Sequence, residues 1–150
     1  MALKQRIESD LKAALLGGDR FVGETLRGLK AAILNEEVAQ NKRDAGLEDA
    51  VIEQIIAKEV KKRNESAAIY EQNQREDSAA DERREAEILS RYLPKQLSEA
   101  ELKTVVDAKV AELGATDIKM MGQVIGAVKK DVGNAADGAM VSKLVKEVLS

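Results

Sequence analysis

The sequence predicts an all-α fold, and three observations support this prediction. Aromatic residues make up only 2% of the 150 residues and there is a single proline, whereas alanine, glutamate, lysine and leucine are abundant. This composition favours helices over strands. Apolar residues recur at intervals of three and four along most of the chain, which is the spacing of one helix face, and no run alternates as a half-buried strand does.

The first two helices are expected on either side of Gly17-Gly18, because glycine readily adopts the left-handed conformation that ends a helix. Asp19 can cap the second helix, which should end in the polar stretch 41–46. Each helix places its apolar residues on one face. These are Leu3, Ile7, Leu11 and Leu15 in the first helix, and Val22, Leu26, Leu29 and Ile33 in the second.

The third and fourth helices complete the N-terminal region. The third should run from about Glu48 to Gln74, and the fourth should start at Asp77 or Ser78. The fourth ends before Pro94, since the residue preceding a proline avoids the helical conformation. Their apolar faces are Val51, Ile52, Ile55, Ile56 and Val60 in the third helix, and Ala86, Ile88, Leu89, Tyr92 and Leu93 in the fourth.

Three further helices are expected after the proline. The segment 98–101 has the pattern of a capping box, in which a serine and a glutamate satisfy each other's backbone donors at a helix start. Gly114 should end this helix, the next should run from Thr116 or Asp117 to Gly133, and Asp137 should cap the last. We therefore expect an N-terminal four-helix domain, residues 1–96, and a small C-terminal three-helix domain, residues 97–150.

Composition restricts the possible chemistry. The chain has no cysteine and no histidine, so it lacks thiolate metal ligands, the commonest metal ligand and the commonest general base at neutral pH. No nucleotide-binding loop, calcium-binding loop or nucleophile motif is present. We expect no catalytic residues, no metal and no cofactor. No apolar run approaches a membrane span and no signal peptide is visible, so we expect a cytoplasmic protein.

Charge argues against a strongly basic nucleic-acid-binding domain. The net charge is −3, and from Leu97 onward there are 7 basic and 8 acidic residues, out of 24 and 27 in the chain. Proteins that grip nucleic acid non-specifically usually carry a basic domain or stripe. Any contact with nucleic acid therefore depends on a local patch.

Gly122 and Gly126 fall on one face of the predicted sixth helix. A glycine inside a helix costs up to about 1 kcal/mol relative to alanine, so two of them need a reason. The favoured interpretation is close packing against another helix, and the alternative is a smooth surface that a ligand backbone can approach. Three lysines in this region, Lys129, Lys130 and Lys143, form a candidate phosphate-binding patch, although surface lysines at this density are ordinary.

Basic residues in the N-terminal region have a second set of interpretations. Lys61 and Lys62 point largely outward from the third helix and fit a solvated face. Arg63 lies in line with the apolar positions, and an arginine there usually pairs with a carboxylate between helices, for which Glu59 or a glutamate of a neighbouring helix would serve. Arg27 lies off the main stripe of the second helix, where Leu34 and Val38 form a minor face that contacts the other unit, a partner, or nothing.

Several stretches together resemble the YqeY family of small bacterial proteins. The most specific are Tyr92-Leu93-Pro94, within the segment 87–98, and Met121-Gly122-Gln123-Val124, followed by Ala136-Asp137-Gly138. The segments 25–33 and 61–66 also resemble the family, and the likeness extends over nearly the whole chain. Relatives often carry a basic residue just before the Ala-Asp-Gly motif, whereas Gly133, Asn134 and Ala135 precede it here. If that basic residue contacts phosphate in the relatives, the contact is either missing in this chain or supplied by Lys129 or Lys130.

The resemblance implies a function as well as a fold. The family is related to the C-terminal tail of the GatB subunit of the tRNA-dependent amidotransferase, whose catalytic centres lie outside that tail. The resemblance therefore implies a non-catalytic protein that binds tRNA or accompanies a tRNA-modifying enzyme. A helical protein-interaction module is the main alternative, and part of a carbon–nitrogen ligase activity is a weaker one suggested only by the kinship.

Overall fold

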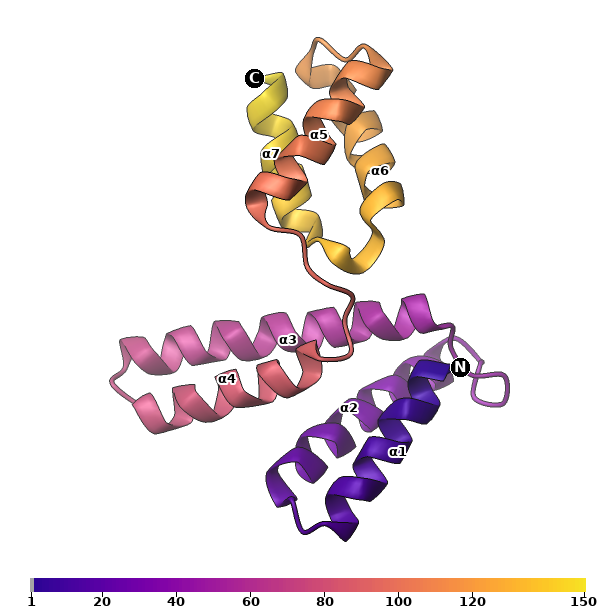
Figure 1. Cartoon of the computed structure of the whole chain (residues 1–150), viewed down its shortest axis with the longest axis vertical. Coiled ribbons are helices and arrows are strands. Elements are labelled where there is room, and N and C mark those ends of the chain that lie inside the picture. The colour runs from indigo at the N-terminus through magenta and orange to yellow at the C-terminus, as the bar shows by residue number, and fades with distance from the viewer. Residues whose placement is uncertain (1) are drawn as a thin grey trace. The chain divides into compact units, whose positions relative to one another are not determined.

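The all-α prediction is confirmed by the computed structural model, which describes residues 2–150 (Figure 1). These residues form seven α-helices and two short 3-10 helices, and they include no strand. The chain divides into two compact units, Met1–Leu93 and Pro94–Ser150. Among the described residues, no helix is both long enough and apolar enough to cross a membrane.

The first unit consists of two helical hairpins. Its helices are α1 (Ala2–Leu16), α2 (Arg20–Ala39), α3 (Asp49–Gln72) and α4 (Glu76–Ser90). Figure 1 shows α1 beside α2, and α3 beside α4, each pair joined by a short turn. The Asp19 side chain accepts a hydrogen bond from the backbone N–H of Val22 at 3.2 Å, so it caps α2 as predicted.

The apolar stripes of these helices meet in one aliphatic core. Most stripe residues of α1 and α2 are buried together with Ile52, Ile56, Ile88 and Leu89, and Leu47 from the loop before α3 joins them, whereas Val22 is only partly buried. Leu15 is the exception in the α1 stripe, because it is 50% exposed near the end of its helix. Burial of this apolar surface is the main stabilising contribution to the unit.

Helix α4 begins slightly earlier than the sequence predicts. Asp77 and Ser78 were the expected starting residues, but α4 starts at Glu76 and its N-terminal flanking residue Arg75 makes no side-chain cap. The reason is a tight turn after α3: Gln74 adopts a positive φ of 58° and the Arg75 N–H bonds back to the Tyr70 carbonyl at 2.8 Å. The chain therefore reverses without needing a separate capping residue.

The second unit is a three-helix unit built from α5 (Glu99–Leu113), α6 (Met121–Val132) and α7 (Gly138–Leu149), as Figure 1 shows. The predicted caps are present: Ser98 accepts from Glu101 N–H, and Asp137 accepts from Ala139 N–H. Its separate core is formed by buried residues of all three helices, chiefly Leu102, Val106, Val124, Val128, Val141, Leu144 and Val145.

Helix α6 starts later than predicted. Asp117 caps not the α-helix but a short 3-10 turn, η1 (Ile118–Met120), by accepting from Lys119 N–H at 3.0 Å. At its other end Gly133 has a φ of 53° and opens a second 3-10 turn, η2 (Gly133–Ala135). Only glycine adopts such a positive φ at little cost, which explains why this helix ends there.

The boundary between the two units lies between Leu93 and Pro94, three residues before the predicted boundary at 96/97. The side chain of Gln96 donates to the Asn134 carbonyl at 2.9 Å, and the backbone N–H of Leu97 donates to the Ala135 carbonyl at 2.8 Å. Both acceptors lie in η2, so the linker residues are fastened to the second unit. That this unit folds on its own stays a prediction.

Candidate nucleic-acid interface

The glycines of α6 lie on the surface and not in a helix contact. Gly122 and Gly126 are both exposed, and a Cβ atom built on either would meet no other atom within 4 Å. The interpretation that they allow close helix packing is therefore wrong. The buried side of α6 is formed instead by Val124 and Val128.

Two of the candidate lysines share the outer side of α6 with these glycines. At 100° per residue, Gly122, Gly126, Lys129 and Lys130 fall within about 100° of the helix circumference, roughly opposite Val128. We call this surface the glycine face. Lys129 and Lys130 are exposed, and neither has a carboxylate within ion-pairing distance among residues 2–150. The Lys129 side chain extends toward the start of α7, close to Gly138.

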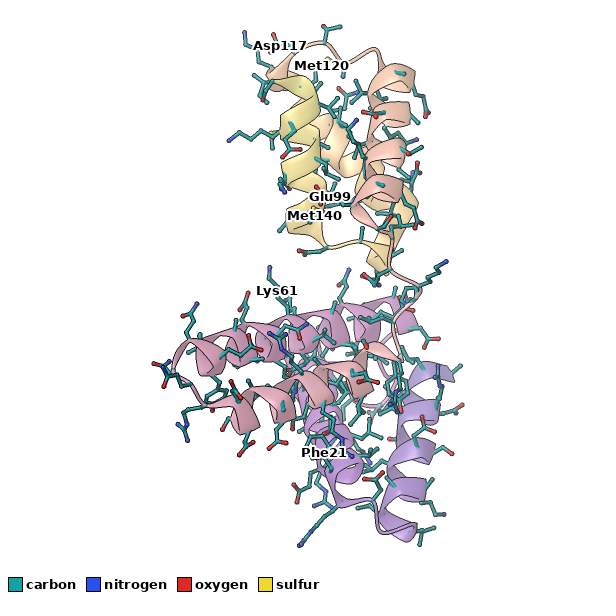
Figure 2. All side chains as sticks on the ribbon, turned by 60° about the vertical axis from the view of Figure 1, so that its left-hand side comes forward. Phe21, Lys61, Glu99, Asp117, Met120 and Met140 are labelled. Carbon is teal, nitrogen blue, oxygen red and sulfur yellow. The ribbon has the colours of Figure 1, made fainter. Side chains whose placement is uncertain are left out.

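The other candidate lysine of the second unit lies elsewhere. Lys143, on α7, has its ammonium nitrogen 3.8 Å from the Glu99 carboxylate, and both side chains are more than half exposed. Figure 2 shows Glu99 at the start of α5. Lys143 is thus directed toward α5, and the structure does not bring it together with Lys129 and Lys130.

Three further lysines of this unit differ in their pairing. Lys103 is bonded to Asp107, and Lys109 is bonded to both Asp131 and Glu112, at 2.9 to 3.0 Å. These hydrogen bonds raise the pKa of Lys109, with Asp131 the larger cause. Lys119, in η1 just before α6, has no such partner within the described chain and is exposed. It is a further cation without an ion-pair partner among residues 2–150, in the turn that leads into α6.

The basic residues of α3 fulfil different roles. Lys61 and Lys62 are exposed, and Figure 2 shows Lys61 on the outer surface of the helix. Arg63 is mostly buried between two carboxylates, 2.9 Å from Glu59 on its own helix and 3.5 Å from Glu85 on α4. Burial raises the pKa of the Glu85 carboxyl, and the Arg63 charge opposes that rise. Arg63 therefore links α3 to α4.

The minor face of α2 is open to solvent. Arg27 is exposed, Leu34 is 41% exposed and Val38 is 56% exposed. Positions 27, 34 and 38 are separated by seven and four residues, so they lie along one side of the helix. This side remains available to a partner.

The sequence patterns did not predict one polar cluster in the first unit. Tyr92, just after α4, donates its hydroxyl hydrogen to Asp10 of α1 at 2.5 Å, and the guanidinium of Arg6 lies 4.8 Å from the centre of its ring. Burial raises the pKa of Tyr92, and the bond to Asp10 adds to that rise. Helical spacing places Arg6 and Asp10 on a polar side of α1, but nothing in it shows that Tyr92 packs over them.

No group of three or more acidic side chains in residues 2–150 is arranged to hold a metal ion. The ion pairs of the described residues lie partly within single helices, as for Lys103 and Asp107, and partly between helices, as for Lys4 and Glu37.

Comparison with known proteins gives three informative relatives, each named altered inheritance of mitochondria protein 41, mitochondrial. The chain is 36% identical to the Kluyveromyces lactis protein over 121 residues, which cover 79% of this chain and 59% of the relative. It is 32% identical to the Eremothecium gossypii protein over 146 residues, covering 92% and 78%. It is 26% identical to the Clavispora lusitaniae protein over 157 aligned positions, covering 98% and 89%. The chain thus spans about three-fifths of the length of the first of these relatives.

These relatives overturn the expected cytoplasmic location. All of them are named as mitochondrial proteins. That expectation rested on missing sequence features, namely a membrane span and a signal peptide. Such absences do not distinguish one aqueous compartment from another.

The family assignment rests on a match that covers almost the whole chain. The model of the Yqey-like protein family matches residues 4–149, which include both helical units and all of the motifs that carry the resemblance. The match contains Tyr92 near the end of the first unit, and Pro94 and the glycine face in the second. The chain therefore belongs to the YqeY family.

Proposed function

We propose that this protein is a non-catalytic tRNA-binding accessory protein, which contacts folded tRNA through the glycine face of α6. The observation that carries the proposal is that Gly122 and Gly126 are exposed with open space in front of them. Each costs α6 up to about 1 kcal/mol relative to alanine. Because no neighbouring helix benefits from their small size, a partner that needs close approach to the backbone is the better explanation.

The surrounding charge suits a phosphate backbone. Lys129 and Lys130 border the glycines and have no ion-pair partner among the described residues, so contact with a phosphate would displace no carboxylate. They also stand in the last turn of α6, where cations stabilise the helix by about 0.3–1 kcal/mol. Structured RNA is recognised largely by shape and backbone contacts, for which a smooth face with a few lysines is sufficient. The kinship with the GatB tail supports tRNA as the RNA.

The proposal is tested by measuring the binding of the full chain to folded tRNA across a range of salt concentrations. Lys129→Ala combined with Lys130→Ala should weaken binding and reduce the salt slope by about one unit per lost phosphate contact. Gly126→Leu should also weaken binding. A side chain at position 126 meets open space, so the melting temperature of this variant should not fall. The lost affinity can then be assigned to the glycine face.

Lys61→Ala combined with Lys62→Ala is the matched control, because it removes two exposed charges from the other unit. It should leave tRNA binding nearly unchanged. Binding that is absent at low salt, or equal for folded tRNA and an unstructured RNA of the same length, contradicts the proposal. A Lys61 and Lys62 variant that loses as much affinity as the Lys129 and Lys130 variant would place the interface elsewhere.

A second candidate function is protein–protein interaction through the minor face of α2. Leu34 and Val38 expose large apolar side chains next to Arg27, and apolar groups beside an arginine are typical of interface centres. This function is favoured over tRNA binding if the chain captures one protein in a salt-tolerant manner. That capture should be lost in Val38→Glu and retained in the Lys129 and Lys130 double variant.

A further inference from the structure

The first unit contains a small cavity, partly open to solvent, that is lined by α1, α2 and residues around the end of α4; its Arg6, Asp10 and Arg91 side chains are exposed. Its volume is about 150 Å³. Helix α1 lines it with Arg6 and Asp10, whereas α2 lines it with Val22 and Leu26. The end of α4 contributes one apolar and two polar side chains, which are Ile88, Arg91 and Tyr92. All of these residues belong to one unit, so the cavity does not depend on the glycine face.

Three polar side chains of this cavity have hydrogen-bonding atoms that no other described residue bonds. Arg6 is positioned by its contact with the Tyr92 ring, yet its guanidinium makes no hydrogen bond and no ion pair within residues 2–150. Arg91 reaches only Glu87, at 3.6 Å, and both of those side chains are more than 60% exposed. Asp10 accepts the Tyr92 hydroxyl through one oxygen, Oδ2, while no described donor bonds its other oxygen, Oδ1.

The size of the cavity limits what it can hold. Pockets for drug-sized molecules measure about 300–1,000 Å³, so this one is smaller than that class. Its volume is about half the lower end of that range. A molecule of this size has only a handful of non-hydrogen atoms, and it must match two cations, one anion and an apolar wall.

We infer that the cavity binds a small α-amino acid with a short aliphatic side chain. The guanidiniums of Arg6 and Arg91 bind its carboxylate, since arginine presents a planar set of donors that matches a carboxylate. Oδ1 of Asp10 accepts from its ammonium group. Val22, Leu26 and Ile88 contact the aliphatic side chain.

The Asp10 carboxylate is the group that selects an amino acid over a simpler ligand. A plain carboxylic acid would place its negative charge near Asp10 without a compensating ammonium, and like charges at short range repel. A plain amine would leave both guanidiniums unused. Tyr92 holds Asp10 in place through its hydroxyl, so the carboxylate is ordered before the ligand arrives.

The test uses Tyr92 as the reporter. The chain has two tyrosines and no tryptophan, so Tyr70→Phe in the full chain leaves Tyr92 as the only intrinsic fluorophore of this kind. Probes are L-alanine, L-valine, propionate and isobutylamine, up to about 10 mM because so few atoms limit affinity. L-Valine or L-alanine should change the emission saturably, whereas propionate and isobutylamine should bind at least about tenfold more weakly.

Two variants locate the ligand charges. Arg6→Gln should weaken amino-acid binding by about ten- to a hundredfold, the usual effect of losing hydrogen bonds to a charged group. Asp10→Asn keeps an acceptor for the Tyr92 hydroxyl but removes the charge, so it should lose discrimination between L-valine and propionate. Arg27→Gln is the matched control: it removes an exposed arginine of α2 and should leave binding unchanged.

Three outcomes overturn the inference. These are the absence of a saturable response to L-alanine or L-valine, equal binding of propionate by the unaltered chain, and unchanged selectivity in Asp10→Asn. If Arg6→Gln does not fold, as judged by its melting transition, Asp10→Asn and the comparison of probes still decide the matter. Loss of tRNA binding in the α6 variants leaves this inference untouched, because the cavity lies in the other unit.

Discussion

The Glu37 carboxylate is the most deeply buried charge in the described chain. Its side chain is 2% exposed, and the ammonium of Lys4 lies 2.9 and 3.0 Å from its two oxygens. Glu37 is on α2 and Lys4 is on α1, so this pair joins the two helices of the first hairpin. A buried charge is tolerated only when it is paired, because removing it from water is costly.

Lys4→Met should therefore destabilise the protein strongly. It leaves Glu37 buried without a partner, which typically costs about 3–5 kcal/mol, and the partial exposure of Lys4 places the effect near the lower end. Chemical denaturation measures the free energy of unfolding. Lys4→Met combined with Glu37→Met should recover most of the loss, because methionine side chains replace both charges with apolar groups. A single variant that unfolds like the unaltered chain would show that water already reaches Glu37.

Tyr92 predicts a loss of stability at alkaline pH. Burial, together with Asp10, holds the pKa of Tyr92 above its ordinary value, whereas the unfolded chain ionises at about pH 10. Below that pH the phenol is protonated in both states and its contribution to stability is fully present. Above it the unfolded chain loses its proton first, so stability falls by up to about 1.4 kcal/mol per pH unit until the folded pKa is reached.

Tyr92→Phe should flatten this alkaline decline, measured as the free energy of unfolding at a series of pH values. Tyr70→Phe is the comparison, because lysines also titrate in this range in both variants. Near neutral pH, Tyr92→Phe should cost about 1–2 kcal/mol for the lost bond to Asp10. Equal alkaline declines in the two variants would mean that Tyr92 ionises as freely in the folded protein as in the unfolded chain.

At the scale of elements, a glycine within α6 and the glycine just after it have opposite roles. Gly126 has an ordinary helical backbone and open space around it, whereas Gly133 has a positive φ of 53° where the helix ends. Only the second position requires glycine for the fold itself. The small size of Gly126 therefore matters for the surface of the helix, whereas the backbone conformation of Gly133 matters for the turn.

Gly126→Ala should raise the free energy of unfolding by about 0.5–1 kcal/mol, the usual difference between the two residues in an exposed helix. Gly133→Ala should lower it by about 1–3 kcal/mol, because alanine is strained at a positive φ. Thermal and chemical denaturation of both variants measure this contrast. Destabilisation by Gly126→Ala would show that its surface is covered within the folded chain.

At the scale of the whole molecule, the second unit has its own apolar core and its own linker contacts. The core comprises residues from α5, α6 and α7, and the segment after Pro94 is bonded to η2 through Gln96 and Leu97. A unit of this size is marginally stable because it buries a smaller share of its surface than a larger domain. The few contacts of the linker therefore matter.

We expect residues 94–150 to fold without the first unit and to melt cooperatively, as followed by circular dichroism. A fragment of residues 98–150 is the control: it lacks both the Gln96 and Leu97 bonds to η2, so its melting temperature should be several degrees lower. Each kcal/mol of lost stability lowers the melting temperature by about 4–8 °C in a domain of this size. A broad, non-cooperative transition for residues 94–150 would refute the division into autonomous domains.

Much of the fold could be predicted from the sequence because it depends on local rules. The apolar stripes predicted all seven α-helices, and Asp19, Ser98 and Asp137 were recognisable as caps because a cap depends on residues within one turn. Helix ends were less accurate near Arg75 and Asp117. There a positive φ or a 3-10 turn, set by local hydrogen bonds, replaced the expected start.

The candidate site was only partly predictable, because contacts between side chains of different helices depend on how the helices pack. Spacing placed Gly122 and Gly126 on one side of α6, but periodicity alone could not tell whether that side faced another helix or solvent. The packing of α5 and α7 against Val124 and Val128 decided that it faces solvent. In the same way, Arg6 and Tyr92 are far apart in the chain, and their contact arises because Tyr92, in the segment after α4, packs against α1 within the first unit. Helical periodicity is a property of neighbours in sequence, whereas a binding surface or cavity is made by residues that only the folded core brings together.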